Sequence, residues 1–459
     1  MKNVLEWLEA TVAKYPDKPA FSDTESSITF RQVYDIARNT GAYLVEQLGV
    51  DRTPIAVFAG RKMVTPAYFL GVVYAGRPYA PIDASLPDKR IEKILENLCP
   101  GAIVADRESR EHVESIVDEL AKAEGFDRPQ IFIAEDISRF EQVACADSNC
   151  KISESAGDAV TDSENDIDGG VVAGCAGKTD DSSRDMLAVV RRQMSMTDPL
   201  YIIYTSGSTG NPKGVMTSHL SLMTYINAYC DVMHIEESDV LGNQSPLDYI
   251  AAIRDIYLPL KTGCSTAIIP KEYFMEPNAL FDYMNEKKVS SVGWSVSAFT
   301  ILTSLGAFEE VGLKSLRKIC FSGSVMPCRV LRKWQENLPE AHFVNQYGPT
   351  EATASCTYYS VDHTVEDDEV LPIGKAYDNY RVFLIDEHGN EPAVGEQGEI
   401  CVCGPILALG YYNDPERTAA AFTLNPLNKA YPERMYAQGI TEGSMRTAYF
   451  ISVDVWTAR

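Results

Sequence analysis

The side chains best suited to chemistry in this sequence lie together in one polar loop, residues 205–214. The loop contains three glycines, four hydroxyl side chains and one lysine, Lys213. Glycines let backbone N–H groups approach an anion closely, and the hydroxyls and the ammonium add donors and positive charge. Lys213 follows Pro212 and not a glycine, which excludes the Walker A pattern. A surface turn rich in glycine and serine is the alternative interpretation, but this composition favours a phosphate-binding loop.

An apolar strand and a helix are expected to hold this loop. Residues 199–204 (PLYIIY) form a short apolar run that is typical of a buried strand, and helical spacing begins at Met216. The sequence therefore predicts a strand, a loop and a helix in succession, with the helix N-terminus facing the bound anion.

Alternating strands and helices extend over most of the chain. Before residue 135, the hydrophobic pattern predicts strands at 55–58 and 102–104 and helices at 30–44 and 63–74. Such alternation is typical of an α/β fold with a mostly parallel sheet. Beyond residue 373 the sequence becomes rich in strands and turns, which predicts a small β subdomain over residues 373–436.

A change of composition separates two parts of the α/β core, residues 1–143 and 187–372. The intervening residues 144–186 contain ten acidic and three basic side chains and almost no large apolar residue. Such a segment cannot bury enough surface to offset its ordering entropy, so we expect a disordered, acidic, low-complexity insertion. An acidic docking segment is the functional alternative.

Composition excludes two classes of partner. The 459 residues include 65 Asp or Glu and 41 Lys or Arg, a formal net charge of −24. Nucleic acids and anionic membranes attract basic surfaces, so we expect neither as a partner. The sequence also lacks an apolar run of about 18 residues that would span a bilayer. Eleven cysteines without a disulfide pattern indicate reduced thiols and a cytoplasmic location, with Cys401 and Cys403 as alternate residues of a strand.

The loop text YTSGSTGNPKGV resembles the phosphate-binding motif of the adenylate-forming enzymes, which include acyl-CoA ligases, luciferases and amino-acid adenylation domains. Residues 345–351 (NQYGPTE) are similar to the second nucleotide motif of that superfamily, and residues 398–412 resemble its GELxxxGxxxxxGY stretch. Residues 75–83 (AGRPYAPID) resemble a block of the branch that contains nonribosomal peptide synthetases and D-alanine–carrier protein ligases. The resemblance spans residues 1–436 and implies the large N-terminal domain of these enzymes, with two parallel-sheet α/β subdomains, a small β-barrel-like subdomain and no C-terminal subdomain.

The resemblance also implies a role for each matching residue, with ATP and Mg²⁺ as the cofactors. Lys213, Thr350 and His219 are the expected catalytic residues, with His219 gating the substrate carboxylate; a histidine of the core or the surface is the alternative. Glu351 and Thr205 are expected to hold Mg²⁺, a hard cation suited to oxygen ligands. Residues 322–324 stand where members commonly carry Gly-Gly-Glu. The nucleotide is expected to contact Thr205, Ser206, Gly207, Ser208, Thr209, Gly210, Lys213, Ser322, Gly323, Ser324, Asn345, Tyr347, Gly348 and Thr350, with Tyr347 stacking on adenine.

The implied reaction joins a carboxylic acid to AMP with release of pyrophosphate. A thiol, either the phosphopantetheine of a carrier protein or CoA, then accepts the acyl group. Adenylation domains usually read FDxS, in which the Asp pairs with the substrate ammonium, but Ile250 stands at that position and cannot do so. Asp248, two residues earlier, takes the place of the family Asp only if the loop shifts its register. Tyr249, Ile250 and Trp294 are the expected pocket residues, so the substrate either lacks an α-amino group or binds in an unusual pocket.

Residues 437–459 depart from the family pattern. Members read Tyr-Arg-Thr-Gly-Asp, whose Asp binds the ribose, and continue into a subdomain with a catalytic lysine, whereas residues 436–440 read YAQGI. Deleting one base from TAT CGC ACA GGG GAT gives TAT GCA CAG GGG AT, which encodes this text. We therefore interpret residues 437–459 as an aberrant, frameshifted tail and expect impaired activity.

The leading hypothesis is ATP-dependent activation of an amino acid or a related acid as an acyl-adenylate for a carrier-protein thiol. The alternatives are an acyl-CoA ligase and a catalytically inactive, nucleotide-binding remnant.

Overall fold

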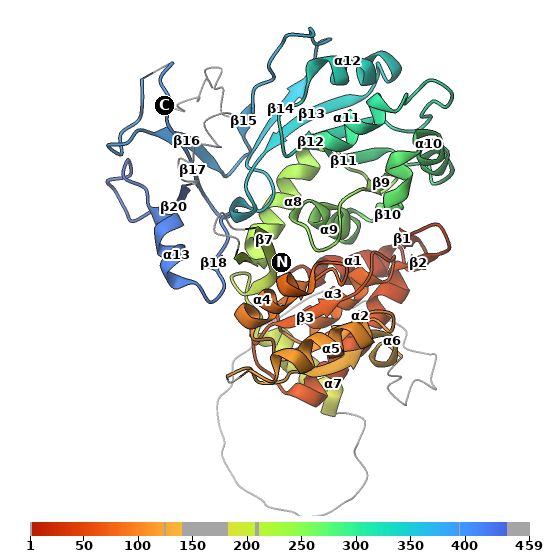
Figure 1. The fold of residues 1–459 in the computed structure, drawn as a ribbon, viewed down its shortest axis with the longest axis vertical. Helices are drawn as coiled ribbons and strands as arrows, with labels where there is room; N and C mark the ends of the chain where they lie inside the picture. Colours follow the sequence, from red (N-terminus) through yellow and green to blue (C-terminus); the bar gives the residue numbers. More distant parts are fainter. Residues whose placement is uncertain (1, 124, 140–181, 207–210, 394, 438–459) are drawn as a thin grey trace, which may run out of the picture.

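The computed structural model describes residues 2–123, 125–139, 182–206, 211–393 and 395–437. Two large sheets and one small sheet organise these residues (Figure 1). Three regions named in the sequence analysis lie wholly or mostly outside the described residues: Gly207 to Gly210 of the polar loop, residues 140–181 of the expected insertion, and residues 438–459 of the tail.

The N-terminal sheet has seven strands in the order β18-β8-β7-β4-β3-β5-β6. The strands from β7 to β6 run parallel, while β8 and β18 are antiparallel to their neighbours. Helices α4 (Asp88–Leu98) and α5 (Arg110–Leu120) pack on one face, and α2 (Phe30–Leu48) and α3 (Thr65–Tyr74) on the other. The strands are β3 (Ile55–Phe58), β4 (Tyr79–Pro81), β5 (Ala102–Ala105), β6 (Gln130–Ile133), β7 (Pro199–Ser206), β8 (Pro212–Ser218) and β18 (Gly410–Tyr411).

The second sheet has nine strands in the order β15-β14-β13-β12-β11-β9-β10-β1-β2, parallel from β13 to β1. Its outer face carries α10 (Pro277–Glu286), α11 (Val296–Ser304) and α12 (Cys328–Asn337), and its inner face carries α8 (His219–Met233) and α9 (Ile253–Thr262). The strands are β1 (Pro19–Ser22), β2 (Ser27–Thr29), β9 (Val240–Asn243), β10 (Ser265–Ile268), β11 (Ser291–Ser295), β12 (Lys318–Ser322), β13 (His342–Tyr347), β14 (Thr357–Val361) and β15 (Lys375–Ala376). The sheet order and strand directions confirm the predicted α/β class.

The largest apolar core lies between the two sheets. It joins α1 (Leu5–Lys14), α2 and α3 to α8 and α9. Figure 1 shows α1, α3, α8 and α9 near the middle of the molecule. The buried hydroxyl of Tyr79 on β4 lies 3.0 Å from that of Tyr257 on α9, so the two halves also share a hydrogen bond. Local sequence supports these helices. Thr29, for example, caps α2 in a reciprocal pair with Gln32.

The strand predicted at residues 199–204 is confirmed as part of β7, but the helix predicted to begin at Met216 is wrong. Strands β7 and β8 form an antiparallel hairpin that pairs Thr205 with Lys213, and α8 begins only at His219. Met216, where the helical spacing begins, lies in β8 and pairs with Ile202 on one side and Gly410 on the other. Because β8 is hydrogen-bonded along both edges, sheet pairing outweighs the local helical pattern.

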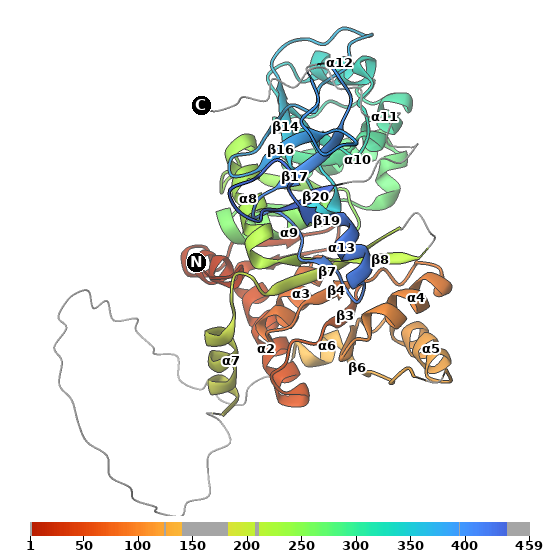
Figure 2. The same ribbon diagram turned by 90° about the vertical axis from the view of Figure 1, so that its left-hand side faces the viewer.

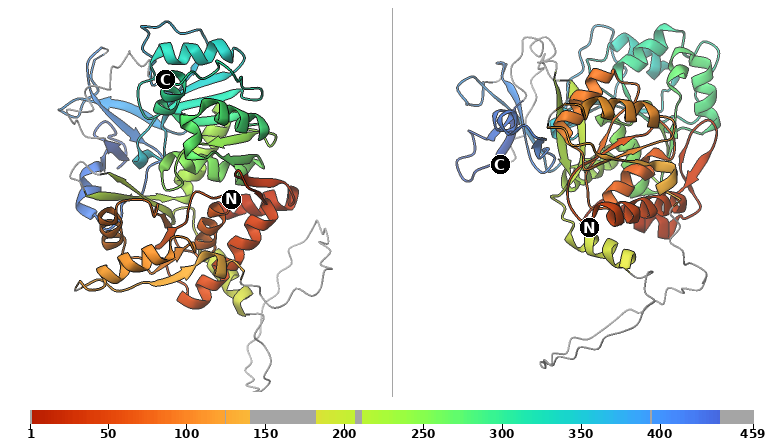
Figure 3. Two further views of the ribbon diagram at one scale, coloured as in Figure 1. Left: turned by 45° about the vertical axis from the view of Figure 1, so that its right-hand side comes forward. Right: turned by 60° about the horizontal axis from the view of Figure 1, so that its bottom comes forward.

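The β subdomain expected over residues 373–436 contains four strands that form a separate antiparallel sheet in the order β16-β17-β20-β19. They are β16 (Arg381–Ile385), β17 (Glu399–Cys403), β19 (Phe422–Leu424) and β20 (Arg434–Ala437), with helix α13 (Pro415–Ala421) beside them. This β subdomain projects from one side of the α/β core (Figure 3). Strands β15 and β18 leave the subdomain and join the two large sheets, so α13 and β18 lie next to β8 (Figure 2). Ala437, the first residue of the expected tail, pairs with Cys401.

The range expected for the acidic insertion ends inside a helix, since α7 (Ser182–Gln193) begins before residue 186. The short helix α6 (Ala134–Ile137) precedes the range that is not described. Both helices pack against α2 through buried apolar side chains such as Ile137 and Val190.

Three negative findings hold for the described part of the chain. No helix there is both long enough and apolar enough to cross a membrane. All eight cysteines within the described ranges are free thiols, and no cluster of His, Cys, Asp and Glu there is suited to a metal ion. Cys401 and Cys403 are buried alternate residues of β17, as the sequence predicts.

Candidate functional site

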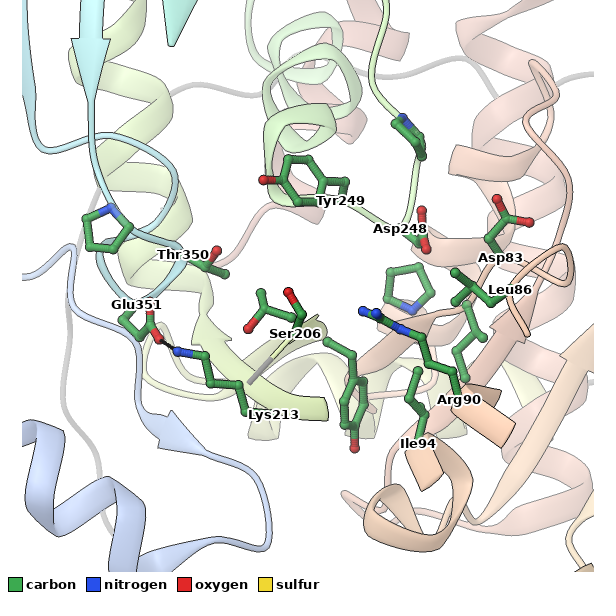
Figure 4. Close-up of a pocket in the computed structure, with 16 residues that line it drawn as sticks. Asp83, Leu86, Arg90, Ile94, Ser206, Lys213, Asp248, Tyr249, Thr350 and Glu351 are labelled. Carbon is green, nitrogen blue, oxygen red and sulfur yellow. Dashed lines mark hydrogen bonds and ion pairs between the residues drawn. The ribbon is translucent and has the colours of Figure 1, made fainter. Parts of the chain in front are cut away.

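A cavity of about 470 Å³ opens between the two α/β subdomains (Figure 4). The seven-stranded sheet and its helices supply one wall, and loops that follow β9 and β13 supply the other. Both walls carry polar groups, which suits a charged ligand. The lining residues are Pro81, Ile82, Asp83, Leu86, Arg90, Ile94, Tyr204, Thr205, Ser206, Lys213, Pro246, Asp248, Tyr249, Pro349, Thr350 and Glu351.

Lys213 and Glu351, from motifs far apart in the sequence, meet in this cavity. Lys213 Nζ donates to Glu351 Oε1 at 2.5 Å, and the Tyr411 hydroxyl donates to the same oxygen at 2.7 Å (Figure 4 draws the first of these). The Lys213 ammonium also lies 5.1 Å from the centre of the Tyr411 ring. The Glu351 side chain is only 4% exposed, so its charge depends on these two partners.

Thr205 and Ser206 present the hydroxyls of the hairpin to the same cavity. The buried Thr205 Oγ1 has no hydrogen-bond partner among the described residues. A buried hydroxyl without a partner favours a ligand that supplies one.

The motif at residues 345–351 turns sharply at the end of β13. Thr350 and Glu351 begin a short 3₁₀ turn, η3 (Thr350–Ala352), which directs both side chains into the cavity. Gly348 permits this turn, because a Cβ atom there would lie 2.4 Å from the Ser355 Cα. The backbone N–H of Ala408 donates to the Glu351 carbonyl at 2.8 Å and so ties the turn to the segment before β18.

Several expected nucleotide contacts do not line this cavity. Ser322 ends β12 and is followed by Gly323 and Ser324, and Tyr347 ends β13 and is followed by Gly348. These parallel strands are neighbours that end at the same edge of the sheet. They therefore lie at one edge of the sheet, close in the chain to the cavity residues Pro349 and Thr350. Asn345 is buried, and its Nδ2 donates to the Pro372 carbonyl at 2.8 Å, so its side chain is committed to the fold.

Of the three expected pocket residues, the structure brings only Tyr249 to the cavity, where its side chain is 53% exposed. Ile250 begins the 3₁₀ turn η1 (Ile250–Ala252) and packs in the main core. Trp294 is fully buried, donates to the Gly242 carbonyl at 2.8 Å and contacts Phe299 and other rings of the second core. Both apolar side chains are more stable in these cores than in a polar cavity, which explains the difference from the prediction.

His219 does not line the cavity either. It is the first residue of α8 and is 1% exposed, and its Nδ1 accepts a hydrogen bond from the Val4 N–H at 3.5 Å. Burial lowers the pKa of the imidazole to about 4, so the ring is neutral at physiological pH. The alternative interpretation, a histidine of the core, therefore describes the environment of His219. Because the imidazole does not line the cavity, its position does not support a role in gating the substrate carboxylate.

Two charged residues of the cavity, Asp83 and Arg90, were not among the expected site residues, and Asp248 was expected there only if its loop shifted register. Asp83 closes the AGRPYAPID block, and Asp248 stands immediately before Tyr249, so both had a nearby sequence signal. Burial, followed by repulsion from Asp83, raises the pKa of the Asp248 carboxyl above its ordinary value. Arg90 lies on α4 and had no motif to mark it.

Two α/β subdomains enclose the β7–β8 hairpin, the pair formed by Lys213 and Glu351, and the turn η3. This arrangement is that of an adenylate-forming ligase. Residues 8–412 match the family described as AMP-binding enzyme, and the chain belongs to that family. The predicted recognition of this superfamily and of an enzyme is thereby confirmed.

Similar curated proteins include carrier-protein ligases. The chain is 29% identical over 430 residues to a D-alanine–D-alanyl carrier protein ligase of Bacillus cereus (strain Q1), covering 93% of this chain and 75% of that protein. It is 28% identical over 437 residues to the enzyme of the same name from Bacillus anthracis (strain A0248), with the same shares covered.

Solved structures share the fold at lower identity. The nonribosomal peptide synthetase FmoA3 (S1046A) superposes with a TM-score of 0.74 at 22% identity, covering 95% of this chain and 41% of that chain. The N-terminal subdomain of Klebsiella oxytoca NpsA, in complex with 3-hydroxybenzoyl-AMSN, gives a TM-score of 0.70 at 18% identity and covers 95% of both chains.

Proposed function

We propose that this chain activates a small carboxylic acid, most simply an amino acid, as an acyl-adenylate and passes the acyl group to a carrier-protein thiol. The observation that carries the proposal is the convergence of Thr205, Ser206, Lys213, Thr350 and Glu351 on one cavity between two α/β subdomains. The names of the similar carrier-protein ligases support the choice of acceptor. The free thiols of the described residues support a cytoplasmic location.

In the proposed reaction, a carboxylate oxygen of the acid attacks the α-phosphorus of ATP. The bond between that phosphorus and the bridging oxygen to the β-phosphate breaks, and pyrophosphate leaves with the electron pair. Phosphoryl transfer of this kind depends on positioning and on neutralising charge. The Thr205 and Ser206 hydroxyls and the Lys213 ammonium supply donors for phosphate oxygens, and Thr350 lies across the cavity to hold the phosphate of the adenylate (Figure 4).

The cavity residues also fit a magnesium ion bound with the nucleotide. Glu351 offers a carboxylate and Thr205 a buried hydroxyl without a partner, both oxygen ligands of the kind that Mg²⁺ prefers. When bound, the ion neutralises phosphate charge. Glu351 must then share its carboxylate with Lys213 and Tyr411.

Asp248 supports an amino-acid substrate despite the isoleucine in the FDxS position. Its carboxyl group lines the cavity next to Tyr249, whereas Ile250 packs in the core. Burial and repulsion from Asp83 raise the pKa of the Asp248 carboxyl, with Arg90 acting in the opposite direction, and a substrate ammonium beside it would favour its charged form. The residue that replaces the family aspartate is therefore proposed to be Asp248.

ATP–pyrophosphate exchange with a panel of acids tests the proposal. The panel contains D-alanine, L-alanine and glycine, with propionate as the analogue that lacks the amino group. We expect acid-dependent exchange with at least one amino acid, and we expect Asp248→Asn to lower exchange with amino acids but not with propionate. Failure to bind ATP would overturn the proposal. ATP binding without exchange for any acid would leave only the nucleotide-binding remnant.

A further inference from the structure

Arg90 is a cation inside the cavity to which neither the sequence motifs nor the proposed reaction assigns a role. It lies on α4 and lines the cavity together with Leu86 and Ile94. Figure 4 shows its guanidinium directed into the open space between Ser206 and Asp248. An arginine directed into a polar cavity is suited to an anion that offers several oxygens.

Arg90 lacks the protein partners that usually accompany a buried guanidinium. Its Nε is buried without a hydrogen-bond partner among the described residues. Its charge acts on the nearby Asp248 carboxyl, whose pKa it lowers against the effect of burial, but no hydrogen bond joins the two side chains among the described contacts. The other cation of the cavity, Lys213, is engaged by Glu351 at 2.5 Å. Arg90 is therefore the cation of the described cavity whose guanidinium no described hydrogen bond engages, and it can add to the contribution of Lys213.

The position of Arg90 indicates which part of the ligand it meets. Thr350 lies on one side of the cavity, Ser206 in the middle and Arg90 beyond it (Figure 4). The proposed function, on which this inference rests, puts the α-phosphate at Thr350 and the following phosphates at the hairpin. A phosphate chain that extends from Thr350 past Ser206 brings its far end to Arg90.

We propose that Arg90 binds the β- and γ-phosphates of ATP and stabilises pyrophosphate as the leaving group. As the bond between the α-phosphorus and its bridging oxygen breaks, that oxygen keeps the electron pair and the charge on pyrophosphate increases. Arg90 donates N–H hydrogen bonds to non-bridging oxygens of this group and transfers no proton. The cavity also contains the carboxyl groups of Asp83, Asp248 and Glu351, so an anion as highly charged as ATP depends strongly on each cation available.

Calorimetric titration of the whole chain tests the proposal with three probes: ATP, inorganic pyrophosphate and AMP, each in the presence of magnesium. For Arg90→Met we expect affinities for ATP and pyrophosphate to fall at least tenfold, while AMP affinity stays within twofold. Lys89→Met is the matched control, because it removes the same charge from the adjacent position of α4. Lys89 is 86% exposed in its side chain and pairs with Glu92, outside the cavity. It should leave all three affinities unchanged.

Arg90→Lys keeps the charge but loses the planar fork, so we expect a smaller loss for ATP and pyrophosphate than in Arg90→Met. This variant carries the test if Arg90→Met does not fold. Equal losses for AMP and ATP, or no loss for pyrophosphate, would overturn the assignment of Arg90 while leaving nucleotide binding intact. A parent chain that binds neither ATP nor AMP would instead refute the proposed function as well.

Discussion

The pair formed by Lys213 and Glu351 allows a structural effect to be separated from a nucleotide-binding effect. The Glu351 side chain is 4% exposed and that of Lys213 is 23% exposed, and their charged atoms lie 2.5 Å apart. Lys213→Met removes the ammonium and leaves the carboxylate with the Tyr411 hydroxyl as its hydrogen-bond donor. Stranding one partner of a fully buried pair costs about 3–5 kcal/mol. Because Lys213 is partly exposed and Tyr411 remains, we expect Lys213→Met to lower the free energy of unfolding by about 2–3 kcal/mol.

Glu351→Gln keeps an acceptor for Lys213 and Tyr411 but removes the negative charge, and we expect it to cost about 1–2 kcal/mol. In the double variant the stranded charge is absent. We therefore expect it to be more stable than the sum of the single losses predicts, with a coupling energy of about 1.5 kcal/mol. Urea unfolding at pH 7.5 without nucleotide, followed by the fluorescence of the four tryptophans, measures all four proteins.

Calorimetric titration of ATP completes the cycle. The double variant should recover stability but not ATP affinity. Removing both charges eliminates the buried carboxylate without a cation, but it does not restore the Lys213 ammonium that donates to phosphate. Losses that add within about 0.5 kcal/mol would refute the reasoning that Lys213 compensates Glu351 in the free protein. Recovery of ATP affinity in the double variant would refute the direct contact between Lys213 and phosphate.

Three further predictions concern other regions of the chain. Burial holds the pKa of His219 at about 4, below the 6.5 of an unfolded chain, so its contribution to stability is present above pH 6.5 and is lost as pH falls toward 4. The loss amounts to about 3 kcal/mol, and His219→Gln should show a correspondingly flatter dependence of unfolding free energy on pH over that range; parallel profiles would contradict the assignment. Trp294→Ala should destabilise the fold by about 3–5 kcal/mol without changing AMP affinity in the protein that remains folded, and a selective change in the acid that is activated would return Trp294 to the substrate pocket. Sequencing of the gene should reveal a missing base near codon 437, and an intact frame that encodes residues 437–459 would end the frameshift interpretation.

Local periodicity predicted the individual elements of the fold well. The expected strand at residues 55–58 coincides with β3, and the expected helix at 30–44 lies within α2. In both cases a short-range pattern and the burial of one surface agree. Residues 212–218 form the strand β8 instead, because β7 and β18 pair with them from both sides. A pattern that depends on a partner about 200 residues away is absent from any local window.

Residues of the candidate site could be predicted where a chemically suited side chain also lies in one of the sequence motifs. Lys213, Thr350 and Glu351 are polar residues of recognised motifs, and the cavity brings them together. Trp294 and His219 were misassigned because an aromatic ring or an imidazole serves a core as readily as a ligand. Arg90 could not be predicted, since only the packing of α4 against the sheet reveals that its side chain enters the cavity.

The helices α6 and α7, which flank residues 140–181, have a practical consequence for handling the protein. Both pack on α2, on the face of the seven-stranded sheet opposite α4, and neither contributes a residue to the cavity. Arg191 of α7 anchors the returning chain by donating to Glu9 at 2.8 Å on the N-terminal helix α1. A fluorescent label attached at Arg192, an exposed residue of α7, would therefore report on the protein from a helix that contributes nothing to the cavity.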